Sequence, residues 1–212
     1  ITDARRTRWP HQRLASTRRM PLLFSASTCE TTSPSLPSRN AICYVGGLRP
    51  EAGLDMVIEA VALLKQSGRL VELHVIGESA TPGFADRLKI MVQQRGLDDC
   101  VRFYGFLKTE AMIQIVRQCR CGICLTPGGE DNYSFYVIPG KIHEYLDCGI
   151  PVIVSKGSCA ATELASAGVV VSTENTPQAI AEAILHSVSD VARALEYRQA
   201  ALRYAREASS PN

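Results

Sequence analysis

The chain has 212 residues, is 46% hydrophobic and carries a formal net charge of +2. Its length suits one domain, or one domain with an extension, and its apolar fraction excludes wholesale disorder. No apolar run reaches the roughly 18 residues that a membrane helix needs, and the N-terminus lacks a secretory pattern. We therefore expect no transmembrane segment and a cytoplasmic location, with peripheral membrane contact left open.

Residues 1–40 differ in composition from the rest. They hold seven arginines against two acidic residues, no lysine, and the stretch STCETTSPSLPS. Because no period of 2 or 3.6 is sustained, we interpret them as an arginine-rich linker or disordered extension, with an optional short helix over 11–19. The alternative is a basic arm for acidic lipid or nucleic acid. The remaining residues are net acidic, so the body of the chain is not expected to bind nucleic acid.

From residue 41 onward, short apolar strands alternate with amphipathic helices. Strands are expected over 41–46, 71–77, 101–105, 121–126, 151–155 and 168–172. Helices are expected over 53–67, 82–95, 108–118, 140–148, 160–166, 176–188 and 190–207. This alternation predicts an α/β domain over 41–212, built on a Rossmann-like, doubly wound parallel sheet of about six strands. Such sheets bind ligands beyond the carboxyl ends of their strands, at the switch point.

Three junctions that follow strands are candidates for this rim. In YVGGLRPEAG (44–53), Gly46 and Gly47 allow backbone to approach a ligand closely. IGES (76–79) is a second small turn at a strand end. The third, over 124–144, is glycine-rich, polar and aromatic, and it is too long for a plain connection. Long loops at such a rim commonly serve a ligand.

The stretch PGKIHEYLDCGIPVIVS (139–155) reads as a helix that feeds a buried strand. Pro139 suits the first turn of that helix, and the amides of Gly140 and Lys141 then form an anion site at its N-terminus. Glu144 lies three residues after Lys141, where its carboxylate could accept hydrogen bonds from ribose hydroxyls. The alternative is a solvated i,i+3 ion pair that stabilises by only about 0.3–0.5 kcal/mol. Spacing alone leaves both interpretations open.

The chain contains eight cysteines, of which Cys119, Cys121 and Cys124 lie close together. A zinc site would need a second cysteine pair or a histidine pair at ligand spacing, and the other cysteines and histidines are scattered. We therefore interpret Cys121 and Cys124 as small apolar residues of a strand, with reduced thiols. No metal site is expected.

Several motifs in order give the chain a family likeness. YVGGLRPEAGLDMVIEA, LHVIGES, VRFYGFL and PGKIHEYLDCGIPVIVS follow one another with plausible spacing over residues 41–190. In this order the chain resembles the C-terminal, donor-binding domain of GT-B fold retaining glycosyltransferases of family 4, the glycosyl transferases group 1. The most specific part is the P-x-K-x-x-E-Y-x-x-x-G-x-P-V-I segment. The resemblance implies one half of a GT-B fold.

The resemblance also implies a donor-binding site. Its members would be Gly46, Gly47, Arg49, Phe106, Leu107, Glu130, Tyr136, Gly140, Lys141 and Glu144. In the family the position of Glu144 binds the nucleotide ribose, and the start of its helix approaches the diphosphate of the donor. Lys141 and Glu144 are therefore the expected catalytic residues, acting through stabilisation of the leaving nucleoside diphosphate. The nucleobase is expected beside Phe106 and Leu107.

Three positions depart from the common family pattern. Many members carry an arginine and a lysine where this chain has Gly47 and Ala52; Arg49 is the candidate substitute, and whether it takes this role is left open. Many also carry a first glutamate eight residues before the second, where this chain has Tyr136. Glu130, with its neighbour Asp131, is the expected source of a carboxylate there. Some branches of the family lack these groups and keep the P-x-K-x-x-E form.

The leading interpretation is a glycosyltransferase donor domain. It would bind a nucleotide-diphosphate sugar of the UDP, GDP or ADP type, without a cofactor or metal, for transfer to an acceptor in glycan or polysaccharide biosynthesis. GT-B enzymes place the acceptor on an N-terminal Rossmann-like domain, so we expect this chain to be truncated and inactive alone. The alternatives are a non-catalytic nucleotide-binding or scaffold domain and, with less support, a sugar-nucleotide epimerase.

Overall fold

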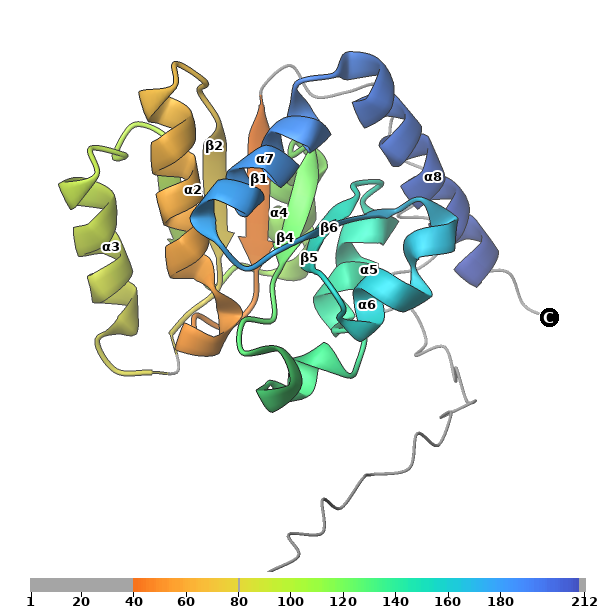
Figure 1. The fold of residues 1–212 in the computed structure, drawn as a ribbon, viewed down its shortest axis with the longest axis horizontal. Coiled ribbons are helices and arrows are strands. Elements are labelled where there is room, and N and C mark those ends of the chain that lie inside the picture. Colours follow the sequence, from red (N-terminus) through yellow and green to blue (C-terminus); the bar gives the residue numbers. More distant parts are fainter. Residues whose placement is uncertain (1–39, 80, 210–212) are drawn as a thin grey trace, which may run out of the picture.

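Six strands form one fully parallel sheet in the order β3-β2-β1-β4-β5-β6 (Figure 1). They are β1 (Ala41–Val45), β2 (Glu72–Ile76), β3 (Val101–Gly105), β4 (Cys121–Cys124), β5 (Val152–Ser155) and β6 (Val170–Thr173). The structure, a computed structural model, describes residues 40–79 and 81–209. The predicted linker and the short helix over 11–19 lie outside these residues.

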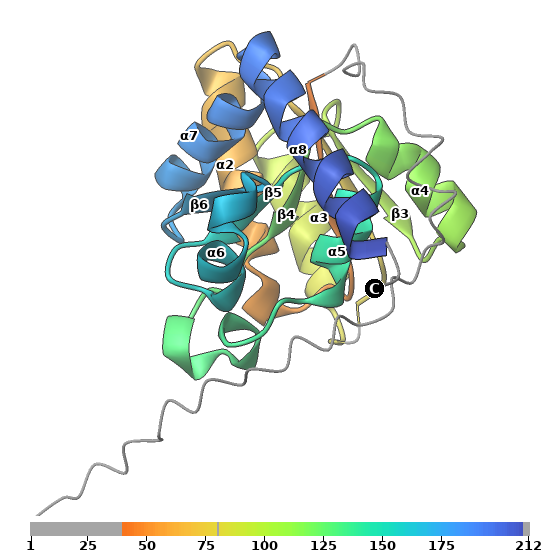
Figure 2. The same ribbon diagram turned by 90° about the vertical axis from the view of Figure 1, so that its right-hand side faces the viewer.

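Helices cover both faces of the sheet, which confirms the doubly wound α/β fold (Figures 1 and 2). One face packs against α2 (Leu54–Gln66), α3 (Phe84–Gln94) and α7 (Pro177–Val188). The other packs against α4 (Thr109–Arg117), α5 (Gly140–Asp147), α6 (Cys159–Glu163) and α8 (Val191–Ser209). Every residue of β1, β4 and β5 is buried, because strands between two helical layers have no face left for solvent.

One predicted helix and the predicted place of one proline differ from the structure. The helix expected over 160–166 is divided into α6 and a 3-10 turn, Ala165–Ala167, which ends at Gly168 in the left-handed region (φ 65°). Pro139 stands just before α5 and not in its first turn, since its ψ of 140° is extended. Its carbonyl nevertheless accepts the first helical hydrogen bond, from the amide of Ile142 at 2.9 Å.

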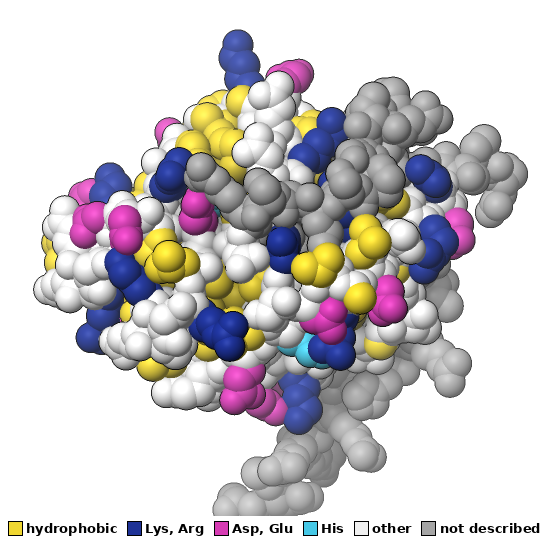
Figure 3. All heavy atoms as spheres, turned by 90° about the horizontal axis from the view of Figure 1, so that it is seen from above, with side chains coloured by type: hydrophobic (Ala, Val, Ile, Leu, Met, Phe, Trp, Pro, Cys, Tyr) yellow, Lys and Arg dark blue, Asp and Glu magenta, His cyan; other side chains and the backbone are white. Residues whose placement is uncertain are grey.

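Short 3-10 turns shape the loops at the carboxyl edge of the sheet. They are Pro50–Ala52 after β1, and Gly129–Asp131 and Tyr133–Phe135 after β4. Elsewhere on the surface, the described residues seen in Figure 3 carry basic and acidic side chains interspersed with one another. None of the helices in the described part of the chain combines the length and apolar character of a membrane span.

The switch point of the sheet lies between β1 and β4. The chain leaves β1 towards α2 on one face and leaves β4, through a long loop, towards α5 on the other. The two strands pair only at Ile42 with Cys121 and Cys43 with Gly122, so they separate before their carboxyl ends. A crevice at this place is where open α/β sheets bind ligands.

Candidate donor-binding site

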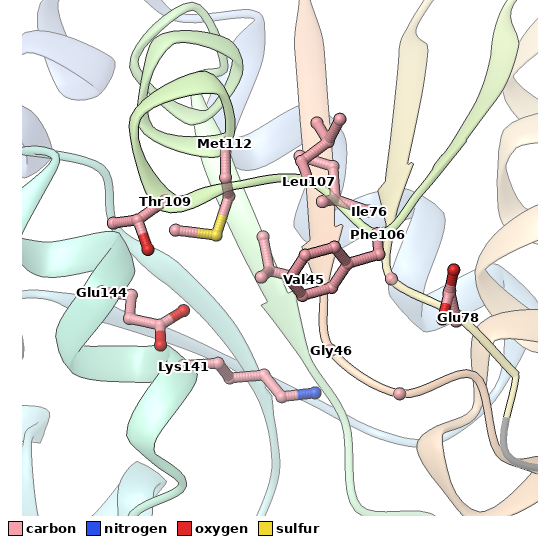
Figure 4. Close-up of a pocket in the computed structure, with 12 residues that line it drawn as sticks. Val45, Gly46, Ile76, Glu78, Phe106, Leu107, Thr109, Met112, Lys141 and Glu144 are labelled. Atoms are coloured by element: carbon pink, nitrogen blue, oxygen red, sulfur yellow. The ribbon is translucent and has the colours of Figure 1, made fainter.

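A cavity of about 600 Å³ lies beyond the carboxyl ends of β1, β2 and β3, against the start of α5 (Figure 4). Three strand-following loops, α4 and α5 contribute to it. Its lining consists of Val45, Gly46, Gly47, Ile76, Gly77, Glu78, Phe106, Leu107, Thr109, Met112, Lys141 and Glu144. The cavity is therefore where the doubly wound topology predicts a ligand.

The turns after β1 and β2 touch each other at two glycines. Gly46 and Gly77 both have a φ of 135°, which side chains rarely allow. A β-carbon on Gly77 would lie 2.0 Å from the carbonyl oxygen of Gly46. The amide of Leu48 also donates to the carbonyl of Glu78 at 2.9 Å. The two turns thus run side by side as a close-packed backbone floor on one side of the cavity.

The ammonium group of Lys141 lies over the turn that follows β1. Its Nζ is 4.3 Å from the centroid of the Tyr44 ring, and Figure 4 shows the side chain reaching toward Gly46. A β-carbon on Gly46 would lie 2.9 Å from this Nζ, so a side chain there would displace the lysine. The Tyr44 hydroxyl donates to the carbonyl of Gly47 at 2.8 Å and braces the same turn. Tyr44 therefore positions both the cation and the turn.

Glu144 lies one helical turn further along α5, on the side of the cavity that carries Thr109 and Met112 (Figure 4). Burial raises the pKa of this half-buried carboxyl group, and the charge of Lys141 acts in the opposite direction. Within the described residues no ion pair joins Lys141 to Glu144, so the solvated ion pair is not what this helix forms. Both side chains instead border the same cavity.

The N-terminus of α5 adds backbone donors to Lys141. The amides of Gly140 and Lys141 precede the first helical hydrogen bond, and no side chain caps this end of the helix. Uncapped amides at a helix N-terminus attract anions. The cation and the amides come from adjacent residues, so an anion near Gly46 could reach both.

The long loop after β4 is tied down at two points. At its base, the amide of Thr126 donates to Ser155 Oγ at 2.7 Å, and Asn175 Nδ2 donates to the Thr126 carbonyl at 3.4 Å. Further along, Asn132 Nδ2 donates to the carbonyl of Glu51 at 3.2 Å and so joins this loop to the loop after β1. These contacts determine which loop residues can approach the cavity.

Six of the ten predicted donor-binding residues line the cavity. They are Gly46, Gly47, Phe106, Leu107, Lys141 and Glu144. The other four, Arg49, Glu130, Tyr136 and Gly140, lie outside its lining. Arg49 is the nearest substitute cation, because its Nε lies 3.5 Å from where a β-carbon on Gly47 would be. The Tyr136 side chain is 56% exposed. The covered part of the side chain and, after it, the carboxylates of Glu130 and Asp131 raise the pKa of its phenol.

Six lining residues were not predicted individually as site residues: Val45, Ile76, Gly77, Glu78, Thr109 and Met112. The first four nevertheless lie in the junctions 44–53 and 76–79, which the sequence predicts at this edge of the sheet because ligands bind at the carboxyl ends of strands. Thr109 and Met112 share one face of α4 at i,i+3 spacing, and only the packing of that helix shows that the face meets the cavity.

The clustered cysteines belong to the core. Cys121 and Cys124 are buried in β4, as predicted, and burial raises the pKa of both thiols. Over residues 40–79 and 81–209, no group of three or more His, Cys, Asp or Glu side chains is arranged to hold a metal ion.

Asp147, at the end of α5, is a buried acid with an incomplete set of partners. It is 4% exposed, and its Oδ2 has no hydrogen-bond partner among the described residues. Burial, together with the charge of Glu144, raises the pKa of Asp147 to about 7. Because an unfolded aspartate titrates near ~4, the folded chain holds an extra proton between these values, and stability falls as the pH rises through this window.

Asp147→Asn should remove this penalty. We expect the variant's gain in unfolding free energy over wild type to be about 1–3 kcal/mol larger at pH 8 than at pH 5, because at pH 5 only part of the window between the two pKa values has been crossed. Urea denaturation at the two pH values measures the difference. Asp98→Asn, at an exposed aspartate, is the matched control and should change little at either pH. Equal effects of Asp147→Asn at both pH values would contradict this explanation.

Known proteins share both sequence and fold with this chain. The family model "Glycosyl transferases group 1" matches residues 32–208. The chain is 26% identical over 153 residues to a GDP-mannose-dependent alpha-(1-6)-phosphatidylinositol dimannoside mannosyltransferase of Mycobacterium tuberculosis (strain ATCC 25177 / H37Ra). That alignment covers 72% of this chain and 36% of the mannosyltransferase, so the chain spans about a third of that relative's length.

Solved structures extend the likeness to the fold. The complex of Anabaena Alr3699/HepE with UDP and glucose matches with a TM-score of 0.64 at 21% identity, over 87% of this chain and 48% of that one. The C-terminal domain of the group 1 glycosyl transferase LpcC from Francisella tularensis matches with a TM-score of 0.61 at 22% identity, over 86% of this chain and 91% of that domain. With the family model matching residues 32–208, the chain belongs to the glycosyl transferases group 1 family and has the Rossmann-like α/β fold of one half of a GT-B structure.

Proposed function

We propose that this chain is the donor-binding domain of a retaining glycosyltransferase that uses a nucleotide-diphosphate sugar. The observation that carries the proposal is the convergence of Lys141, Glu144 and the Gly46 turn on one cavity at the carboxyl edge of the sheet. A cation, a carboxylate and an exposed backbone turn are the groups that a diphosphate and a ribose require. Membership of the family supports this assignment.

The diphosphate would lie between the Gly46 turn and the start of α5. There it would meet the Lys141 ammonium and the amides of Gly140 and Lys141, with Arg49 beside the turn. As the bond to the sugar breaks, negative charge grows on the leaving diphosphate, and these donors are already in place to stabilise it. The chain would contribute to catalysis mainly through this stabilisation.

The nucleoside would extend from the diphosphate toward α4. Glu144 would accept hydrogen bonds from the ribose hydroxyls, at the end of the cavity lined by Thr109 and Met112. Phe106, which is 73% exposed at the rim, and Leu107 offer apolar surface to a nucleobase. An aromatic ring that is exposed at a cavity rim can stack on any base, so this surface suits UDP, GDP and ADP donors alike.

The names of three similar proteins indicate which classes of sugar donor and product to consider. The mycobacterial relative is GDP-mannose-dependent, the Anabaena structure holds UDP and glucose, and another relative is the amylovoran biosynthesis glycosyltransferase AmsK of Erwinia amylovora. We therefore propose a role in glycan biosynthesis with a UDP, GDP or ADP sugar. The acceptor would bind to an N-terminal Rossmann-like domain, without which the chain is expected to transfer sugar poorly.

Calorimetric titration with UDP, GDP and ADP tests the proposal. We expect a Kd in the micromolar-to-millimolar range for at least one nucleotide, or about −4 to −8 kcal/mol. Glu144→Ala should weaken that binding roughly tenfold, because the variant loses the carboxylate that would accept hydrogen bonds from the two ribose hydroxyls. Glu182→Ala, at an exposed glutamate of α7 on the other face of the sheet, is the control and should bind as wild type does.

A nucleotide without ribose hydroxyls sharpens this test. A 2′,3′-dideoxynucleoside diphosphate should bind wild type and Glu144→Ala equally, because the group that the carboxylate recognises is missing from the ligand. If no nucleotide binds the wild-type chain, the donor-domain proposal is wrong.

A non-catalytic nucleotide-binding domain is the second candidate. One observation favours it: the cavity lining includes two carboxylates, Glu78 and Glu144, but a single basic side chain, Lys141. A site with so little positive charge would stabilise a leaving diphosphate weakly. Hydrolysis or transfer of the donor sugar by the chain combined with a cognate N-terminal domain would exclude this candidate.

A further inference from the structure

The hydroxyl of Tyr145 lies between β1 and β4 at the switch point. It accepts a hydrogen bond from the Val45 amide at 2.7 Å and donates one to the carbonyl of Ile123 at 3.3 Å. The side chain is 0% exposed. Burial raises the pKa of Tyr145 well above its ordinary value, so the phenol keeps its proton and can donate and accept at once. A single buried oxygen therefore bridges two strands.

The hydroxyl takes the place of one bond of the sheet ladder. Successive amides of a strand point to opposite sides, and the Gly46 amide bonds to the carbonyl of Ile76 on β2. The preceding amide, that of Val45, must therefore point toward β4, where Ile123 offers its carbonyl. In a continuous parallel ladder these two groups would bond directly. With the Tyr145 oxygen between them, the strands are held further apart at their carboxyl ends.

Gly122, inside β4, makes room for the Tyr145 ring. A β-carbon at this position would lie 2.5 Å from the nearest ring carbon, far inside van der Waals contact. A glycine weakens the interior of a strand, so it occurs there mainly where another group must approach the backbone closely. The Tyr145 ring on α5 therefore explains why a glycine stands at position 122 of this fully buried strand.

The same side chain joins the two parts of the candidate site. Val45 immediately precedes Gly46, the turn that would face the diphosphate. Tyr145 immediately follows Glu144 and lies one turn after Lys141 on α5. The bridge therefore connects the end of β1 to the helix that carries both charged residues. The fit there is tight, because the Lys141 ammonium lies 2.9 Å from where a β-carbon on Gly46 would be.

We propose that Tyr145 is a positioning residue of the donor site: its hydroxyl sets the separation between the Gly46 turn and the start of α5. The inference rests on the proposed function, since it concerns the site that would hold the diphosphate. Without the hydroxyl, the Val45 amide and the Ile123 carbonyl either stay unpaired or close onto each other. In both cases α5 loses its hydrogen bond to β1, and the position of Lys141 over the turn changes.

Tyr145→Phe tests the inference in the full chain. The ring still fills the space beside Gly122, and the loss of one buried hydroxyl is small beside the stability of a domain, so the variant should fold. We expect its affinity for the nucleoside diphosphate that binds wild type to fall roughly tenfold. The matched control is Tyr197→Phe, which removes a hydroxyl that contacts His186 between α7 and α8, does not line the cavity, and should leave binding unchanged.

A double-mutant cycle with Lys141→Ala separates positioning from a purely structural role. If Tyr145 acts through α5, the double variant should bind only slightly more weakly than Lys141→Ala alone. Wild-type affinity in Tyr145→Phe, with lower thermal stability only, would overturn the inference and leave the proposed function intact. The inference would also be overturned if the loss of affinity in the double variant equalled the product of the losses in the two single variants.

Circular dichroism guards against misfolding. If Tyr145→Phe is unfolded, the hydroxyl is required for the fold itself, and that result would overturn a positioning role in the donor site. If the wild-type chain binds no nucleotide at all, the proposed function fails, and the positioning role fails with it.

Discussion

Lys141→Ala is expected to weaken nucleoside diphosphate binding about 10- to 100-fold, because a charge-assisted hydrogen bond to phosphate contributes about 1.5–3 kcal/mol. Lys141 is the one lysine or arginine among the residues that line the cavity. No other cation of the lining can therefore replace its charge when it is removed. Calorimetry with UDP, GDP and ADP measures the loss. Lys89→Ala, at an exposed lysine of α3, is the control.

The dependence on phosphate makes this prediction specific. The loss in Lys141→Ala should shrink when a nucleoside monophosphate replaces the diphosphate, and it should nearly vanish with the free nucleoside. It should also be smaller at high ionic strength, where the wild-type attraction is already screened. An equal loss for diphosphate and nucleoside would show that Lys141 supports the shape of the cavity and does not bind phosphate.

Gly77→Ala is expected to lower the free energy of unfolding by about 3–5 kcal/mol, enough to unfold much of the chain. Two effects combine. The φ of Gly77, 135°, is strained for any residue with a side chain. The new β-carbon would also lie 2.0 Å from the backbone carbonyl oxygen of Gly46, and a backbone atom cannot move aside as a flexible side chain can. Urea denaturation measures the change.

Gly83→Ala isolates the effect of backbone strain. Gly83 also has a positive φ, 72°, but a β-carbon there would meet nothing within 4 Å. This variant should therefore lose only about 1 kcal/mol. If both variants are destabilised equally, the contact between the turns after β1 and β2 does not matter for stability. Since Gly46 lies in one of these turns, any Gly77→Ala protein that folds should also bind nucleotide more weakly.

The strands and helices were readable from the sequence because their signals are local. Apolar runs such as AICYV are buried on both faces, which is what a parallel sheet between two helical layers requires. The start of α5 and the charged pair Lys141 and Glu144 were equally readable, since a helix N-terminus and i,i+3 spacing depend on neighbours in sequence alone. Family likeness then indicated what such a pair could bind.

The sequence did not predict which residues of the loop after β4 face the cavity. The family resemblance placed Tyr136 at the position of a first glutamate in the donor site and Glu130 as a substitute carboxylate, yet both lie outside the cavity lining. The path of the loop depends on contacts such as that between Asn132 and Glu51, which are far apart in sequence. Composition cannot reveal such a contact, so it cannot say which loop residues face inward.

The sequence by itself determined the α/β class, the parallel sheet, the edge at which a ligand would bind and the helix that carries Lys141 and Glu144. Each of these follows from periodicity, helix ends or topology rules. Only the tertiary structure decided that Thr109 and Met112 face the cavity, and that Gly122 is a glycine because the Tyr145 ring occupies the space that a side chain would need. The physical reason is that these features depend on the separation of strands and helices across the sheet, which packing sets and no local pattern encodes.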